Sequence, residues 1–159
     1  MKKVLFLFFI LIFISSCAKD QVIKENIKEG PFLVVKVIDG DTLDIESGER
    51  IRLSGIDAPE RGECYYKESK SVLANLTLNK TISIQQDITD IDKYGRLLRY
   101  IYLEEFLVNE YMVREGYAVV YDKYKDDTSK YILLKEIEKE AVLENKGMWK
   151  CQNISKLKS

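Results

Sequence analysis

Residues 37–60 read VIDGDTLDIESGERIRLSGIDAPE, and this stretch decides the fold because it holds two alternating segments separated by short polar turns. Apolar residues alternate with polar ones over 42–46 and again over 50–53, which is the period of half-buried β-strands. Glycine, aspartate and serine occupy the turns between them. Together with the valine-rich segment 32–38, the pattern predicts a three-stranded meander.

The remaining chain continues as a mixture of strands and helices. The predicted strands are 81–86 and 96–103, with a polar loop between them, and the predicted helices are 66–78, 105–115 and 128–145, with a short apolar segment at 117–121. Five strands with a helix inserted after the third is the order of a small Greek-key barrel. We therefore predict an α+β, mainly β fold over residues 31–152: a five-stranded OB-fold Greek-key barrel with three helices.

The amino terminus carries an export signal in its sequence. Two lysines precede the uninterrupted apolar run VLFLFFILIFI at 4–14, which is shorter than the roughly 20 residues of a membrane span. Ile-Ser-Ser-Cys at 14–17 resembles a bacterial lipobox, with Cys17 as the lipidated residue. We expect a signal peptide at 1–16 and a lipid-anchored tether at 17–30; a plain signal peptide, an uncleaved anchor and an incidental thiol at Cys17 are the alternatives.

The composition limits the chemistry. Without residues 1–16 the Lys and Arg count falls from 25 to 23 while the 26 acids remain, so the net charge is near −3. This is not the broad basic surface of a tight nucleic-acid binder, and a polyanion would require a local cluster with a bound cation. The chain has no histidine. Its absence excludes Ser-His-Asp hydrolysis, Cys-His proteolysis and His-rich zinc sites.

If Cys17 carries lipid, Cys64 and Cys151 are the two cysteines that remain. Export makes a disulfide between them chemically allowed. Loop-entropy models make such a long closure worth roughly 4 kcal/mol. Two separate thiols are the alternative, because sequence supplies no geometry. The last residues, 153–159, are expected to form a polar tail.

Acidic residues in the opening stretch suggest a cation site. A helix-flanked calcium loop beginning at Asp39 is excluded, because its third ligand position is Leu43 and its glycine position is Asp44. Asp41 and Asp57 could still hold a hard cation if they lie at the ends of adjoining strands. Oxygen ligands favour calcium or magnesium over zinc.

Arginines beside such a cation are suited to phosphoryl chemistry, since guanidiniums bind phosphate oxygens and a carboxylate can orient or deprotonate water. Arg52 and Arg96 fit the first role and Glu60 the second. Taken singly, each residue also has an ordinary explanation as a turn or strand-edge charge. We interpret Arg50 as a solvated charge, and Asp39 likewise, with a possible supporting role beside the cation.

The motifs GDT at 40–42, RIRLSGIDAPE at 50–60 and DKYGR at 92–96 resemble those of the staphylococcal nuclease (thermonuclease) family, in the same order. The resemblance runs from about residue 34 to 149. It implies a five-stranded barrel with three helices and a calcium-dependent enzyme acting on DNA and RNA. Such an enzyme breaks the bond to the 5′ oxygen and leaves 3′-phosphate products.

The resemblance also implies roles for individual positions. The metal ligands would be Asp41, Asp57 and the backbone carbonyl of Ala58, which stands where the best-known member has threonine. The remaining roles are phosphate clamps at Arg52 and Arg96, a general base or water-orienting acid at Glu60, and substrate contacts at Tyr94 and Tyr124. Tyr124 lies among acids where the known member is more basic.

The expected protein is therefore a calcium-dependent secreted nuclease that prefers single-stranded or flexible DNA and RNA as substrates. We expect a monomer, anchored to a cell-envelope membrane outside the cytoplasm through lipid on Cys17, with a released extracellular form as a further possibility. The alternative function is a non-catalytic nucleic-acid-binding module on the same barrel, because fold alone does not determine activity. A third hypothesis is a structural lipoprotein of the cell envelope, which would leave the joint presence of the candidate site residues unexplained.

Overall fold

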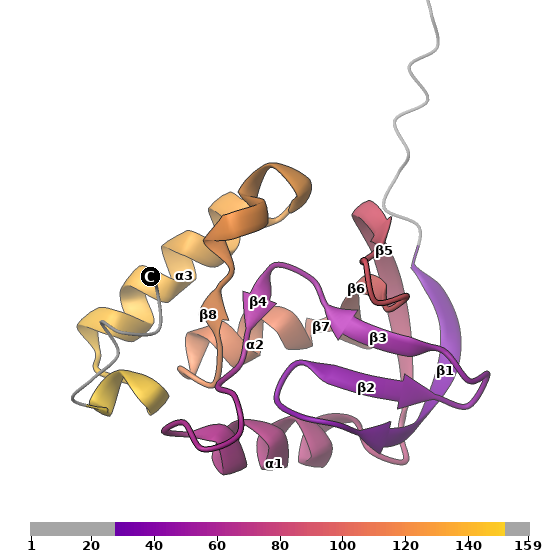
Figure 1. Cartoon of the computed structure of the whole chain (residues 1–159), viewed down its shortest axis with the longest axis horizontal. Helices are drawn as coiled ribbons and strands as arrows, with labels where there is room; N and C mark the ends of the chain where they lie inside the picture. Colours follow the sequence, from indigo (N-terminus) through magenta and orange to yellow (C-terminus); the bar gives the residue numbers. More distant parts are fainter. Residues whose placement is uncertain (1–27, 152–159) are drawn as a thin grey trace, which may run out of the picture.

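A computed structural model describes residues 28–151, and its centre is a closed barrel (Figure 1). The barrel strands are β1 (Glu29–Val37), β2 (Thr42–Ile45), β3 (Arg50–Leu53), β5 (Thr81–Ile91) and β6 (Leu97–Leu103). They follow the order β3-β2-β1-β5-β6, and a parallel pairing of β3 with β6 closes the sheet on itself. The predicted five-stranded barrel with three helices is confirmed.

The long strand β1 makes closure possible because it pairs antiparallel with β2 along one part and with β5 along another. Its register shifts between Val34 and Lys36, and such irregularities bend a strand. Aliphatic side chains from every barrel strand fill the interior, among them Val34, Leu43, Ile45, Ile51, Leu53, Ile82, Ile84 and Ile101. Burial of this apolar surface is the main force that holds the barrel closed.

Three helices cover the barrel: α1 (Tyr66–Thr77), α2 (Val108–Arg114) and α3 (Tyr131–Leu143). Figure 1 shows α1 along one side of the barrel and α3 on the far side of α2. Leu73, Met112 and Leu134 are fully buried and bring one helix each into the core. Among the helices of residues 28–151, none has the length and apolar character needed to cross a membrane.

Strand β5 is longer than predicted. The segment after residue 86 was expected to be a loop, yet β5 continues to Ile91, with a register shift between Gln86 and Ile91 in its pairing with β6. The polar residue Asp87 interrupts the apolar alternation and produced the wrong boundary. Its side chain is buried in a hydrogen-bond network, so its polarity marks a tertiary contact and not a solvent-exposed loop.

The region after β6 also differs in detail. Residues predicted as the start of the second helix form β7 (Phe106–Leu107), and the third helix is preceded by a 3-10 segment, η1 (Asp122–Asp127). A second 3-10 segment, η2 (Gly147–Lys150), follows α3. A second small sheet pairs β4 (Ile56–Asp57) with β8 (Val119–Val120). Pairings only two residues long leave no periodic signal in the sequence.

Gly40, in the turn between β1 and β2, fixes how closely α1 approaches the barrel. A Cβ atom at this position would lie 2.0 Å from Oγ of Ser69 on α1 and 2.7 Å from Cβ of Ala58. Any larger residue would therefore separate α1, the turn and the segment after β4. Glycine is required here by space, and it places Asp41 beside Ala58.

Asp87 joins four parts of the chain through its buried carboxylate. Oδ2 accepts hydrogen bonds from the hydroxyls of Ser54 and Tyr100, the latter at 2.9 Å. Oδ1 accepts from the backbone N–H of Ser129 at 2.8 Å. The Tyr100 hydroxyl also accepts from the backbone N–H of Lys130 at 3.0 Å. This network connects the barrel to the entrance of α3.

Tyr100 is expected to make the fold sensitive to alkaline pH. Burial raises the pKa of its hydroxyl well above the ordinary value, and the charge of Asp87 adds to the rise. The contribution of the protonated Tyr100 hydroxyl to the free energy of unfolding is fully present below about pH 10, the ordinary pKa of tyrosine in an unfolded chain. It is lost as the pH rises from there toward the raised pKa of the folded state. At pH 11 the loss is on the order of 1 kcal/mol for this group.

Urea unfolding at a series of pH values checks this expectation. Tyr100→Phe is expected to lose less of its free energy of unfolding than the wild type between about pH 9 and pH 11, because it cannot ionise. Tyr94→Phe removes a phenol hydroxyl from an exposed ring and serves as the control. Equal alkaline losses in the wild type and Tyr100→Phe would contradict the role of Tyr100.

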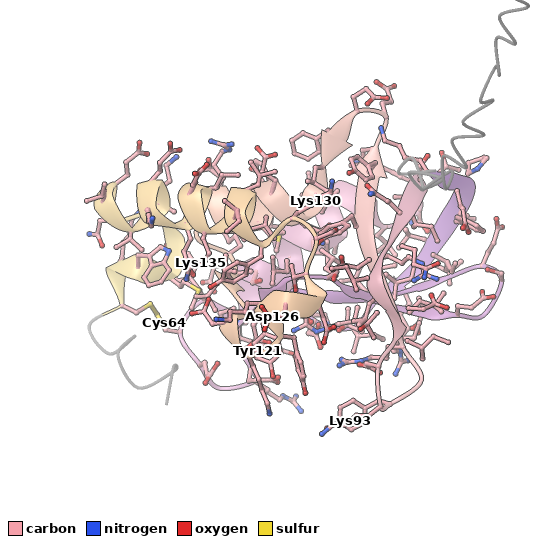
Figure 2. The ribbon with its side chains drawn as sticks, turned by 90° about the horizontal axis from the view of Figure 1, so that it is seen from above. Cys64, Lys93, Tyr121, Asp126, Lys130 and Lys135 are labelled. Carbon is pink, nitrogen blue, oxygen red and sulfur yellow. A yellow bond between two sulfur atoms is a disulfide. The ribbon has the colours of Figure 1, made fainter. Side chains whose placement is uncertain are left out.

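A disulfide joins Cys64, just before α1, to Cys151 at the end of η2 (Figure 2). The two Cα atoms are 6.5 Å apart, and the sequence separation is 87 residues. The bridge therefore connects the loop after β4 to the carboxyl-terminal end of the domain. The expected signal peptide, Cys17, most of the tether and the polar tail lie outside the described residues.

Candidate active site

Arg52 is the centre of the candidate site, and its guanidinium is held on three sides. Nε lies 3.0 Å from Oδ1 of Asp41, and Nη2 donates to Oδ1 of Asp57 at 2.7 Å. Nη1 donates to the backbone carbonyls of Leu53 at 2.9 Å and Ile56 at 2.5 Å. These contacts come from β3 itself, from β4 and from the turn before β2. The side chain is thus fixed before any ligand arrives.

Asp41 is almost fully buried, with 6% of its surface exposed. Its Oδ1 accepts a hydrogen bond from the Thr42 hydroxyl at 2.9 Å, and its Oδ2 accepts from the backbone N–H of Ala58 at 2.7 Å. Burial raises the pKa of Asp41 to about 6, although Arg52 opposes the rise. Asp39 lies close enough to raise it further, and its Oδ1 accepts from the Asp41 backbone N–H at 3.1 Å.

Asp57 approaches Arg52 from the other side and remains open to solvent, since 42% of its side chain is exposed. It lies on β4, which pairs with β8 in the small second sheet. Burial raises its pKa, Arg52 acts in the opposite direction, and the charges of Glu63 and Asp39 add to the rise. The structure therefore brings Asp41, Arg52 and Asp57 together, as the sequence led us to expect.

The charges around Arg52 favour a bound cation. One guanidinium faces Asp41 and Asp57, and Asp39 and Glu63 act on these carboxylates as well. A cation would offset this excess of negative charge, and hard oxygen donors suit calcium or magnesium. Within residues 28–151, no three His, Cys, Asp or Glu side chains gather as a metal site. The two aspartates fit a metal whose further ligands are backbone oxygen and water.

Glu60 lies on the loop beyond β4, and its carboxylate is exposed. Among the described residues this carboxylate has no hydrogen-bond or ion-pair partner. Its backbone is held instead: Oε2 of Glu63 accepts from the Glu60 N–H at 2.6 Å, and the Glu63 N–H donates to the Glu60 carbonyl at 2.9 Å. Cys64, which follows Glu63, is joined to Cys151 by the disulfide. The loop is thus fixed while the carboxylate is left available.

Arg96 lies in the turn between β5 and β6 and is positioned by Asp92. Oδ1 of Asp92 accepts from the backbone N–H groups of Tyr94 and Arg96 at 2.9 and 3.0 Å, and Oδ2 accepts from Nε of Arg96 at 2.7 Å. Gly95 supplies the positive φ of +80° that the tight turn requires. The turn therefore presents Arg96 in one orientation, partly exposed.

The two candidate aromatic residues occupy neighbouring surfaces. Tyr94 is 71% exposed at the tip of the β5–β6 turn, with the Arg96 guanidinium 5.4 Å from its ring centroid. Tyr124 lies in η1 with its ring 5.4 Å from that of Tyr121. A hydrogen bond to Tyr94 raises the pKa of Lys93, and the charges of Tyr124 and Tyr121 add to the rise. Figure 2 shows Lys93 and Tyr121 on the same side of the molecule.

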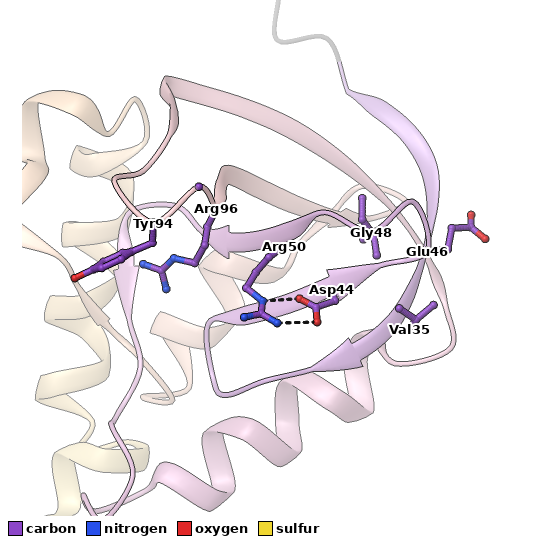
Figure 3. Close-up of a pocket in the computed structure, with 9 residues that line it drawn as sticks. Val35, Asp44, Glu46, Gly48, Arg50, Tyr94 and Arg96 are labelled. Atoms are coloured by element: carbon purple, nitrogen blue, oxygen red, sulfur yellow. Dashed lines mark hydrogen bonds and ion pairs between the residues drawn. The ribbon is translucent and has the colours of Figure 1, made fainter.

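A groove of about 520 Å³ lies against the outside of the barrel, and Arg50 and Arg96 both line it (Figure 3). Arg50, interpreted from the sequence as a solvated charge, forms a two-pronged ion pair with Asp44, with Nε–Oδ1 at 2.7 Å and Nη2–Oδ2 at 3.0 Å. The structure thus gives Arg50 a fixed place beside the candidate phosphate clamp. Asp41, Arg52, Asp57 and Glu60 do not line this groove.

Sequence reasoning missed the residues that position the site. Asp92 and Glu63 each hold the backbone near a candidate residue. Asp92 had a recognisable signal, because an aspartate that opens a turn with glycine three residues later commonly accepts from backbone N–H groups. Glu63 had no recognisable signal in the sequence, because its hydrogen bond to the Glu60 backbone depends on the path of the loop.

The fold and the site define a class: an oligonucleotide-binding type of barrel in which an arginine is held between two aspartates. The staphylococcal nuclease homologue family matches residues 50–151. The chain belongs to this family.

Relatives named as nucleases are similar to this chain over most of its length. An "Uncharacterized endonuclease" of Escherichia coli is 36% identical over 120 residues, covering 73% of this chain and 74% of the relative. A "Micrococcal nuclease" of Shigella flexneri is 33% identical over 132 residues, covering 76% and 74%. A "Thermonuclease" of Staphylococcus intermedius is 31% identical over 134 residues, covering 78% and 79%.

Proposed function

We propose that the protein is a calcium-dependent nuclease that hydrolyses phosphodiester bonds in single-stranded or flexible DNA and RNA. Family membership and the names of the relatives support a nuclease function. The observation that carries the proposal is the fixed position of Arg52 between Asp41 and Asp57, with Glu60 left unpaired nearby in sequence. Arginine beside oxygen donors for a cation is the arrangement that phosphoryl chemistry needs.

In this mechanism each side chain has a separate task. Asp41, Asp57 and the Ala58 carbonyl would hold Ca²⁺, which when bound polarises a phosphate oxygen and neutralises developing charge. Arg52 and Arg96 donate hydrogen bonds to the phosphate oxygens and stabilise their added charge. Glu60 orients a water molecule or takes its proton as the oxygen attacks phosphorus. The bond to the 5′ oxygen breaks, which leaves a 3′-phosphate.

The proposed location is the cell envelope, outside the cytoplasm. The lipobox at Cys17 supports anchoring of a monomer by lipid, and a released form would need cleavage of the tether. The disulfide between Cys64 and Cys151 is consistent with an oxidising compartment. Mass spectrometry of the membrane fraction tests this proposal: a mature chain that begins at an unmodified residue other than Cys17 would contradict it.

Metal removal is the direct test of the proposed activity. The purified full chain in mild detergent is expected to cut single-stranded DNA with calcium and to lose at least about a hundredfold in rate in excess chelator, because a catalytic metal contributes several kcal/mol. Added calcium should restore the rate. Cleavage that continues unchanged in chelator would exclude the metal mechanism. Tight binding without turnover under any metal would identify a non-catalytic binding module.

A further inference from the structure

The groove beside Arg96 has the dimensions and side chains of a ligand site. Its volume of about 520 Å³ falls in the roughly 300–1,000 Å³ range of small-molecule sites, which accommodates a nucleotide. Strands β1, β2 and β3 contribute one wall, and the β5–β6 turn contributes the other (Figure 3).

We propose that this groove is a second substrate subsite that binds the nucleotide next to the cleaved linkage of a single strand, with Arg50 contacting its phosphate. The inference rests on the proposed nuclease function, since it names where the strand runs beyond the reacting phosphate. It changes the role of Arg50 from a solvated charge to a residue that sets the path of the substrate.

The alternation of β3 places Arg50 in line with Arg52. Ile51 and Leu53 point into the core, so the two arginines occupy the opposite face, two residues apart. Two residues of a strand span about 6.6 Å, a separation that neighbouring phosphates of a flexible single strand can match. A strand with one phosphate at Arg52 can therefore bring the next one to Arg50.

Asp44 prepares Arg50 for this contact. Their two-pronged ion pair uses Nε and Nη2, and among residues 28–151 Nη1 has no hydrogen-bond partner. The Arg50 side chain is 47% exposed, so Nη1 is accessible to an anion. A guanidinium already fixed by one carboxylate loses little freedom when it binds a phosphate.

The remaining lining fits the sugar and base of a single nucleotide. Tyr94 presents an exposed ring on which a base can stack, and Val35 offers an exposed apolar surface on β1. Glu46, also exposed, would repel a phosphate at its end of the groove. The groove is lined by two arginines, one aromatic ring and two acids, and one of those acids is paired with Arg50. This balanced set of charges fits a single nucleotide with its phosphate better than a general polyanion surface.

Binding of labelled DNA in excess chelator, which is expected to suppress cleavage, tests the subsite. Arg50→Ala is expected to weaken binding of a single-stranded octamer about tenfold, with a smaller loss for a dinucleotide. The slope of log K against log salt concentration should fall by about 0.7, the value for one lost phosphate contact on a single strand. Glu46→Gln is expected to strengthen octamer binding a few-fold.

Arg114→Ala is the matched control. Arg114 is also a half-exposed arginine in an ion pair, with Glu110 of α2, and it does not line the groove. Octamer binding in this variant should equal that of the wild type, and melting curves of both arginine variants verify folding. Equal binding by Arg50→Ala and Arg114→Ala would overturn the subsite.

The assay also separates this inference from the proposed enzyme activity. If the wild type cuts no DNA but Arg50→Ala binds the octamer more weakly than the wild type does, the subsite is supported and the nuclease function is refuted. If the wild type cuts DNA and Arg50→Ala binds the octamer as tightly as Arg114→Ala, the nuclease function is supported and the subsite is refuted. A wild-type protein that neither binds nor cuts refutes both.

Discussion

Glu60→Gln is expected to lower kcat on single-stranded DNA by about a hundredfold to a ten-thousandfold, the usual contribution of a positioned acid or base. Glutamine has nearly the same shape as glutamate but cannot take a proton. The melting temperature should stay close to that of the wild type, because the Glu60 carboxylate is exposed and has no partner among residues 28–151. Steady-state kinetics with calcium and a thermal melt measure the two quantities.

The control for this variant is Glu136→Gln, which removes an exposed carboxylate on α3. It should change neither kcat nor the melting temperature. A Glu60→Gln protein with normal kcat would remove Glu60 from the mechanism. A fall in melting temperature that accompanies the loss of activity would make its role structural.

Loss of the disulfide is expected to have the largest effect on stability. Because it links residues 87 apart in sequence, its removal should lower the free energy of unfolding by about 4 kcal/mol. The cross-link acts mainly by restricting the unfolded chain. Without it the unfolded chain has more conformational entropy, which favours unfolding. Urea unfolding of the wild type and of the double variant Cys64→Ser/Cys151→Ser measures the difference.

The two single variants provide the control. Cys64→Ser and Cys151→Ser should each lose as much stability as the double variant, since either change removes the same bond. Additive losses would show that the thiols act separately. Intact-mass measurement without reduction gives an independent check, and free thiols at both positions would contradict the bridge.

The sequence predicted the barrel well because most of its strands alternate over four residues or more. The motif in 37–60 also pointed to Asp41, Arg52 and Asp57 as one group, and the structure brings them into contact. They are close in sequence and need only one meander to meet. Arg96 is more distant, and its contribution depended on recognising the turn at 92–96. These features are local, so local patterns were enough to find them.

Tertiary contacts explain what the sequence could not show. Asp87 resembles a loop residue because nothing local indicates that Ser54, Tyr100 and Ser129 surround it. Arg50 resembles a surface charge because its groove forms only when the β5–β6 turn lies against β2 and β3. In both cases the surroundings of a polar residue are formed by parts of the chain that lie far away in sequence.

The parallel pairing of β3 with β6 has a consequence for the timing of activity during synthesis. Ribosomes make β3 early, but its partner strand ends only at Leu103, and Arg96 immediately precedes that strand. A nascent chain that stops before the β5–β6 turn has an open sheet and lacks Arg96, one of the two arginines proposed to bind phosphate. Any activity that depends on Arg96 would therefore require synthesis to continue through β6.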